Sequence, residues 1–533
     1  MEEQGPSTSG RQASLLRHGS ILSLLTLASR LLGLAREVVK ASLLGTSALA
    51  DAFSVAVLLP NLFRRLFAEG SIAVAFIPTF KEYLLAKDKA ETREFLSCVL
   101  TFLSFAVTVA VMLGILAAPL AVRLFGIEQF DEAVLLTRIM FPFLGFVSLA
   151  ALFQGILNST NVFAPPGFAP ILLNVAVILC AWGLSPHMAN PARAMAVGVL
   201  LGGIAGTAIQ LPFVLKNGHR FFFVGLRRAF ANPGTRKVLR LIGPTIIGMA
   251  AYQINDLVSV ALAGNAGEGV VSSLQYSLRL QELILGVFAV SIGTVLLPRL
   301  AEHAKSARWD SFNERLISAM DVIALVSVPV TFFALAQGET LIRLVFQGSS
   351  FDETSVRLTV SAFVFHMPGL FFIALNRILA PAFYAQSDTR SPTLAGIISF
   401  AANIVLAVIL VRHFRGAGIA LALSASSAVN TALLLAFLGR NPHVQVARAL
   451  GSAILYTLKL ALLSVVAIIP VAFLSPLLLD ALAGNGRLVS FGLPLAINGL
   501  IFAFLGIALL MATRDRQFRG IVGALRRRGK RGE

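Results

Sequence analysis

Four arginines lie inside long apolar stretches of this sequence, where a charged side chain is energetically unfavourable. They are Arg30, Arg36, Arg64 and Arg279. A charge at the centre of a bilayer costs roughly 2.5–3.5 kcal/mol, so such residues face a protein interior or an aqueous cavity rather than lipid. A guanidinium group presents a planar fork of donors that matches phosphate oxygens bidentately. These residues therefore indicate a binding site for an anionic phosphate or diphosphate.

Acidic residues close to the arginines are candidates for supporting or gating roles: Glu37, Asp51, Glu69 and Glu282. A structural reading stays open for two pairs, because Arg30 with Glu37 and Arg65 with Glu69 have spacings that place both members on one helical face. The arginines outnumber the carboxylates that could neutralise them. Substrate binding is therefore the favoured reading for the group, while Arg65 with Glu69 is interpreted as an ion pair.

Glu37 is also a candidate for coupling to a cation, together with Asp256 and Asn403. A purely structural role is an equal alternative for the first two. Lys40 is expected to extend its ammonium group to the outer membrane interface, as long basic side chains near helix ends do.

The composition places these residues in a membrane protein. The chain has 533 residues, of which 57% are hydrophobic and 13% charged, whereas soluble domains have about 45–50% and 25%. The net charge of +18 is explained by basic cytoplasmic loops, so nucleic-acid binding is not favoured. Cys98 and Cys180 lie in apolar runs, which argues against a disulfide or a cysteine metal site. Residues 1–19 are polar and lack the layout of a cleavable signal.

A bilayer core of about 30 Å needs about 20 apolar residues per helix. That length predicts an all-α polytopic protein with about fourteen transmembrane helices, at 20–43, 51–79, 95–123, 132–157, 167–185, 193–215, 241–263, 270–298, 315–345, 355–384, 391–412, 416–438, 451–478 and 487–512.

Loop charges predict the orientation of these spans. Basic residues follow the second span and fill the loop after the sixth, whereas the connections 127–132, 264–269 and 347–353 contain no Lys or Arg. The positive-inside rule places the basic loops in the cytoplasm and the others outside, with both termini inside. Arg412 and Arg415 are exceptions on the outer side.

An internal repeat relates the two halves at an offset of about 220 residues. Ser71-Ile72 with Pro78 matches Ser291-Ile292 with Pro298, and Arg36-Glu37 with Gly45 falls opposite Asn255-Asp256 with Gly264. Copies that lie six spans apart keep the same orientation, which predicts two pseudo-symmetric six-helix lobes with a site between them. The expected domains are a cytoplasmic tail 1–19, an N-lobe 20–215, a basic loop 216–240, a C-lobe 241–438, two extra helices in 439–512 and a basic cytoplasmic tail 513–533.

No catalytic motif is found: the sequence has no phosphate loop, HExxH motif or nucleophile elbow. A transporter without a cofactor or metal is therefore expected rather than an enzyme.

Three segments resemble one family: Ser29 to Glu37, Asp51-Ala52-Phe53, and Leu59 to Gly70. They look like the N-terminal signature of the MurJ (MviN) lipid II flippases, and Asn158 to Asn174 and Arg279 to Pro298 are similar to later motifs of that family. The resemblance implies the fold of the multidrug/oligosaccharidyl-lipid/polysaccharide flippase (MOP) superfamily. It also implies that Arg30, Arg36, Arg64 and Arg279 are the arginines of the central cavity, with Asp51 as the outer-end aspartate. Two positions depart from the family pattern. Glu37 stands where the family commonly has Asp, and Leu278 stands where some members have Asp.

What the resemblance implies is a lipid II flippase for peptidoglycan synthesis and cell shape, in the bacterial inner membrane. Lipid II, membrane lipids, a monovalent cation and the cell-wall synthesis machinery are the expected partners. Two alternatives remain open: a flippase for another polyprenyl-diphosphate glycan, and a drug/cation antiporter, which would need an anionic cavity.

Overall fold

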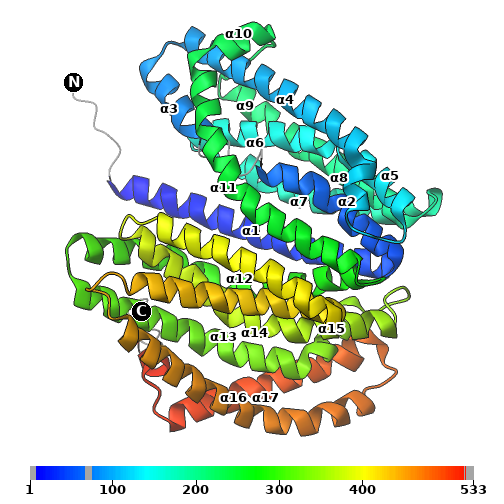
Figure 1. Cartoon of the computed structure of the whole chain (residues 1–533), viewed down its shortest axis with the longest axis vertical. Helices are drawn as coiled ribbons and strands as arrows, with labels where there is room; N and C mark the ends of the chain where they lie inside the picture. The colour runs from blue at the N-terminus through cyan, green and yellow to red at the C-terminus, as the bar shows by residue number, and fades with distance from the viewer. Residues whose placement is uncertain (1–7, 67–74, 521–522, 524–533) are drawn as a thin grey trace. The chain divides into compact units, whose positions relative to one another are not determined.

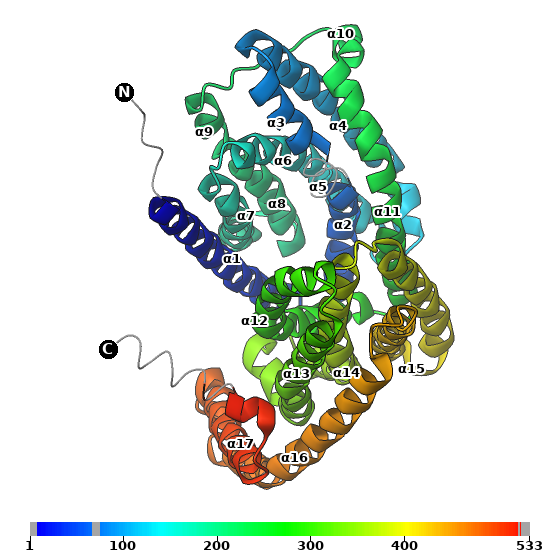
Figure 2. The same ribbon diagram turned by 90° about the vertical axis from the view of Figure 1, so that its left-hand side faces the viewer.

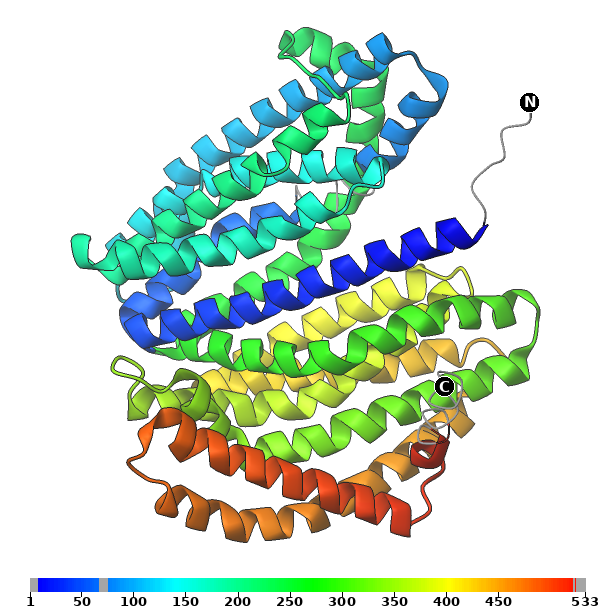
Figure 3. The same ribbon diagram turned by 180° about the vertical axis from the view of Figure 1, so that it is seen from behind.

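The computed structural model describes residues 8–66, 75–520 and 523, all of whose regular structure is helical. Contacts divide the chain into two compact units, residues 1–271 and 272–533. Figures 1, 2 and 3 show the helices of both units from three sides.

Unit 1 is a bundle in which α7 packs between α1 and α8 (Figure 2). Its helices are α1 (Thr8–Leu44), α2 (Ala48–Arg64), α3 (Ile77–Ala86), α4 (Lys89–Arg123), α5 (Phe130–Met140), α6 (Phe143–Ser159), α7 (Ala164–Gly183), α8 (Pro191–Ala208), α9 (Leu211–Lys216), α10 (Leu226–Ala231) and α11 (Pro233–Gly264).

Unit 2 is a second helical bundle, whose first helix begins two residues before the division. Its helices are α12 (Val270–Lys305), α13 (Trp309–Phe346), α14 (Glu353–Tyr384), α15 (Arg390–Leu438), α16 (Val446–Ala481) and α17 (Leu493–Ala512). A core of buried apolar side chains joins α13, α14 and α15, with Phe312, Leu316, Ile378 and Leu435 among its members. The apolar residues recur at helical spacing because each helix buries one face.

The predicted fold class is confirmed. Within the described part of the chain, nine helical stretches are long and apolar enough to cross a membrane. One of them, α15, contains two predicted spans, because the backbone breaks at Arg415 (φ 49°, ψ −128°). The predicted spans near residues 20–43, 51–79, 241–263 and 270–298 correspond to α1, α2, α11 and α12, which carry more charge or are only partly described. The chain is therefore a multi-pass membrane protein.

The fourth predicted span, 132–157, is not one continuous helix. It breaks into α5 and α6 at Phe141 and Pro142. Proline has no N–H to donate to the carbonyl four residues earlier, which favours a break at this position. The Phe141 ring lies against Gly114 of α4, where any added Cβ would come within 1.9 Å of the ring. Gly114 therefore makes room for the aromatic side chain at the break.

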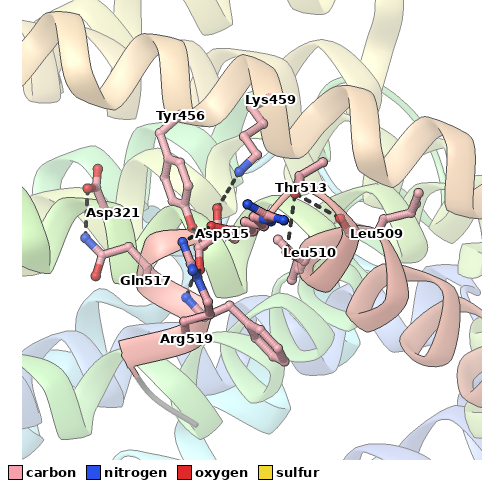
Figure 4. Close-up of polar contacts among 11 residues, drawn as sticks. Asp321, Tyr456, Lys459, Leu509, Leu510, Thr513, Asp515, Gln517 and Arg519 are labelled. Atoms are coloured by element: carbon pink, nitrogen blue, oxygen red, sulfur yellow. Dashed lines mark hydrogen bonds and ion pairs between the residues drawn. The ribbon is translucent and has the colours of Figure 1, made fainter. Parts of the chain in front are cut away.

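Residues 513–519, the C-terminal latch, follow α17 and fold against α13 and α16 (Figure 4). Asp515 is 2% exposed, and its carboxylate accepts from Lys459 Nζ (2.6 Å) and from the Tyr456 hydroxyl (3.0 Å). Gln517 Nε2 donates to Asp321 Oδ2 of α13 over 3.0 Å. The latch thus joins three helices through buried polar contacts.

A second polar cluster joins the same helices near their opposite ends. Asn498 Nδ2 of α17 donates to Gln337 Oε1 of α13 over 3.2 Å, and Gln337 also contacts Ser475 of α16. Polar side chains between apolar helices are a common means of helix association in membranes. The last two helices are therefore fixed to α13 at two levels.

Candidate functional site

Unit 1 contains a cavity of about 670 Å³ whose wall includes Arg30 of α1 and Arg64 of α2. The rest of the wall comes mainly from α6, α7 and α8. Three of its glycines, Gly202, Gly203 and Gly206, lie on α8. Its other polar lining residues are Thr26, Ser29, Gln154, Asn158 and Gln210. Among the described residues that line the cavity, none is an aspartate or a glutamate, so the cavity is cationic.

Local contacts position both arginines. Arg64 is the last residue of α2, and its Nε donates to Asn61 Oδ1 one turn earlier over 2.9 Å. The backbone beside Arg30 is held by the buried Asn174 of α7, whose amide donates to the Ser29 carbonyl over 3.2 Å. Within the described residues no ion pair involves Arg30. The two predicted cavity arginines are thus brought to one wall.

Arg36 lies outside the residues that line this cavity and instead belongs to a buried charged group with Glu37 and Lys40. Arg36 Nη2 is 2.8 Å from Glu37 Oε1, and Lys40 Nζ is 3.8 Å from Glu37 Oε2. The Lys40 ammonium also donates to Ser54 Oγ of α2 over 2.9 Å.

The expectation for Lys40 was therefore wrong. Its side chain is only 4% exposed and does not extend to the outer interface. The physical reason is that Ser54 accepts a hydrogen bond from the ammonium group and Glu37 supplies a counter-charge 3.8 Å away inside the protein.

Asp51 links the start of α2 to the loop between α11 and α12. Its Oδ2 accepts from the Gly269 backbone N–H over 2.8 Å in a buried contact. Glu268 makes a matching contact, accepting from the Ala48 N–H over 2.8 Å. Acceptors at a helix N-terminus satisfy backbone donors that have no partner within the helix. Sequence analysis missed Glu268, because a single acid in a polar loop has no distinguishing pattern.

Arg65 and Asp256 form an ion pair between α2 and α11, with Arg65 Nη1 at 2.9 Å from Asp256 Oδ2. Arg65 was expected to pair with Glu69, which lies outside the described residues. Asp256, a candidate for cation coupling, thus has a guanidinium partner in this structure.

Three predicted residues belong to unit 2. Arg279 Nη1 lies 2.9 Å from Glu282 Oε2, three residues along α12. Asn403 of α15 is buried, and its Oδ1 accepts from Ser426 Oγ over 3.3 Å. Both cysteines are free thiols.

Comparisons with known proteins are consistent across sequence and structure. The family model described as "Lipid II flippase MurJ" matches residues 40–482. The chain is 45% identical over 510 residues to "Probable lipid II flippase MurJ" of Treponema pallidum (strain Nichols), covering 95% of this chain and 97% of that protein. It is 34% identical over 424 residues to "Lipid II flippase MurJ" of Burkholderia cenocepacia, covering 78% and 81% respectively.

Solved structures give the same result. A structure titled "Lipid II flippase MurJ, inward closed conformation" matches with a TM-score of 0.76 at 26% identity, covering 93% of this chain and 99% of that one. An inward-facing multidrug resistance MATE transporter of the MOP superfamily matches with a TM-score of 0.66 at 14% identity, over 79% of this chain and 96% of that one. The second likeness concerns the fold alone.

Proposed function

Because the chain belongs to the MurJ lipid II flippase family, we propose that it carries lipid II from the inner to the outer leaflet of the bacterial cytoplasmic membrane. Lipid II is a polyprenyl-diphosphate-linked precursor of peptidoglycan. The observation that carries this proposal is the cavity of unit 1, lined by Arg30 and Arg64 and, among its described residues, by no carboxylate. The protein is a transporter, not an enzyme.

The diphosphate is the part of the substrate that this cavity suits. Each guanidinium can donate two parallel hydrogen bonds to phosphate oxygens, and charge-assisted bonds of this kind are about twice as strong as neutral ones. The negative charge of the diphosphate complements a wall that has two arginines and, among its described residues, no carboxylate. Arg36 and Arg279 complete the proposed set of substrate-binding arginines, with Glu37, Asp51, Glu69 and Glu282 in supporting or gating roles.

Transport then follows an alternating-access cycle. The head group docks on the arginines from the cytoplasmic side while the polyprenyl tail stays in the lipid phase. Closure of the inner side and opening of the outer side release the head group outside. Asp51, Glu268 and Gly269 lie at the proposed outer end of unit 1, where their contacts would break or form during the cycle.

The driving force and the remaining partners belong to the same proposal. Both termini face the cytoplasm, in line with the loop charges. A monovalent cation coupled through Glu37, Asp256 or Asn403, and the cell-wall synthesis machinery, are further proposed partners.

The cavity does not favour a drug/cation antiporter, because a cationic guest needs carboxylates in the wall. A flippase for another polyprenyl-diphosphate glycan would use the same arginines. Complementation separates that alternative from lipid II: expression of this chain should restore growth to bacteria depleted of their own lipid II flippase. Lipid II should become accessible outside the same cells. Growth failure with normal membrane insertion would refute lipid II as the substrate.

A further inference from the structure

Two hydrogen bonds join the segment of α12 that carries Arg279 to His366 of α14. Ser277 Oγ lies 2.6 Å from His366 Nδ1, and the Gln281 side-chain amide donates to the His366 backbone carbonyl. Ser277 stands two residues before Arg279 and Gln281 two residues after it. His366 therefore holds α12 on both sides of the arginine.

Together with helix geometry, this attachment constrains the direction in which the Arg279 side chain points. Residues four apart share a helical face, so Ser277 and Gln281 both point at α14. Arg279 is about 200° around the helix from each of them and lies on the opposite face. Burial agrees, since Ser277 and Gln281 are 0% and 3% exposed while the Arg279 side chain is 42% exposed. The bonds to His366 thus set where Arg279 points.

The α14 side of this contact is itself held in place. His366 is 1% exposed, and Pro368, two residues later in α14, lacks a backbone donor. Ser424 of α15 bridges this turn: its Oγ accepts from the Gly369 N–H over 3.1 Å and donates to the Phe365 carbonyl over 2.6 Å. A Cβ at Gly369 would come within 2.6 Å of Ser424 Oγ, so the two helices approach closely here. Movement of His366 independent of α14 is therefore restricted.

We infer that His366 is a positioning residue for Arg279, fixing the rotation of α12 so that the guanidinium fork meets the substrate diphosphate. This inference rests on the proposed function. Bidentate recognition depends on the angle of the fork as well as on its charge, and supporting side chains must hold such groups to within about 0.5 Å and 10–20°. A histidine that touches no substrate thus contributes to substrate affinity.

A double-mutant cycle on the purified full-length protein tests this, with the affinity for lipid II as the measured quantity. His366→Leu removes the ring nitrogen while keeping an apolar side chain, and should weaken binding roughly fivefold or more. In the Arg279→Ala background the same change should alter binding by less than about twofold, because residues that act as one unit are not additive. His366→Asn places an amide oxygen at the same number of bonds from Cα as Nδ1, and should recover most of the affinity.

A matched control separates positioning from general loss of packing. Phe363, also in α14 and fully buried, lies against Gly338 of α13. Phe363→Ala should cost the same factor in affinity with or without Arg279. Should His366→Leu behave like Phe363→Ala, or leave affinity unchanged in the wild-type background, the inference is overturned.

If His366→Leu does not fold, Ser277→Ala replaces it in the cycle with the same expectations. If Arg279→Ala itself binds lipid II normally, the proposed role of Arg279 fails and the inference fails with it, a result distinct from additivity.

Discussion

Arg30 and Arg64 place two guanidinium groups in a cavity without a carboxylate among its described lining residues. Most other cations in unit 1 for which a contact is known have an acid beside them: Arg65 has Asp256, Arg193 has Glu132, and Lys237 has Glu82. An exposed ion pair such as that of Lys237 with Glu82 contributes at most about 1 kcal/mol to stability. Arg30 and Arg64 differ from these cations in lining a cavity of about 670 Å³. The contrast predicts different outcomes for substitution at the two kinds of site.

Arg64→Ala should abolish lipid II flipping without removing the protein from the membrane. Arg64→Lys should be impaired less, because charge persists while the planar fork is lost, at about 1.5–3 kcal/mol for each missing charge-assisted bond. The measurement is lipid II translocation in cells. Arg228→Ala is the matched control, since Arg228 makes an exposed ion pair with Glu94 outside the cavity and should flip normally. Normal flipping by inserted Arg64→Ala would remove Arg64 from the site.

Glu37→Gln tests cation coupling. The amide keeps an oxygen acceptor for Arg36 and Lys40 but loses the negative charge, so coupling through Glu37 predicts a changed dependence of flipping on membrane potential or ion gradient. Translocation should be measured with and without a dissipated potential. Glu82→Gln, at an exposed ion pair with Lys237, serves as the control. An unchanged dependence would leave Glu37 with a structural role alone.

At the scale of helices, the C-terminal latch is the feature that sequence patterns did not indicate. Tyr456, Lys459 and Asp515 are individually ordinary, and only the fold brings Asp515 beneath α16 (Figure 4). The contact between Lys40 and Ser54 was missed for the same reason, because hydropathy depends on residue type and does not show which residues meet in the fold. The break at Phe141 and Pro142 was missed for a related reason: proline is common in spanning helices, and its effect depends on how neighbouring helices pack.

Asp515→Ala should destabilise unit 2. The change leaves the Tyr456 hydroxyl and the Phe518 N–H without their acceptor and Lys459 without its carboxylate. Unpaired buried donors cost about 1–3 kcal/mol each, and the part-exposed Lys459 adds less because water can solvate it. The thermal midpoint of the purified protein should fall relative to Asp480→Ala, an acid in the last turn of α16. Equal midpoints would show that the latch contributes no stability.

Lowering the pH should remove the contribution of Asp515 to the stability of the folded protein. Burial acts to raise the Asp515 pKa, but Lys459, the Phe518 N–H and Tyr456 outweigh it and hold the pKa below its ordinary value of 3.8. A lowered folded-state pKa means that the stabilisation is complete above the unfolded value and is lost as the pH falls through the folded value. The difference in thermal midpoint between wild type and Asp515→Asn should therefore be constant above about pH 5 and shrink below pH 3.8. A difference that grows on acidification would contradict this.

For the whole molecule, span length and hydropathy predicted most of the architecture. The predicted span 315–345 lies within α13 (Trp309–Phe346), and the repeat agrees with α1 ending at Leu44 and α11 at Gly264, 220 residues apart. These features were predictable because a bilayer fixes helix length and apolar content. The position of Arg30 and Arg64 on a cavity wall was predictable because a charged side chain within a span is costly in lipid. Asp51 with Gly269, and His366 with Ser277, depend on contacts between distant segments that no local pattern encodes.

Cysteine labelling from outside tests the orientation. Single cysteines at Ala266 and Ser349 should react, whereas those at Lys87 and Arg227 should not, because the positive-inside rule predicts that the basic loops are cytoplasmic. Cys98 and Cys180 are free thiols and should first be replaced by alanine. Labelling of Lys87 and Arg227 after permeabilisation provides the control. External labelling at Arg227 in intact cells would reverse the orientation and the direction of transport.

The corner at Arg415 has a consequence for how the protein is made. The two halves of α15 join there without a loop, and Gly418 lies so close to the Leu410 carbonyl that a Cβ would come within 2.3 Å of it. Ser399 Oγ of the first half donates to the Ser426 carbonyl of the second over 2.6 Å, so 391–412 and 416–438 form a helical hairpin. In the proposed orientation that hairpin carries Arg412 and Arg415 across the membrane against the charge preference of the loops. We therefore expect the two spans to enter the membrane as one unit rather than one after the other.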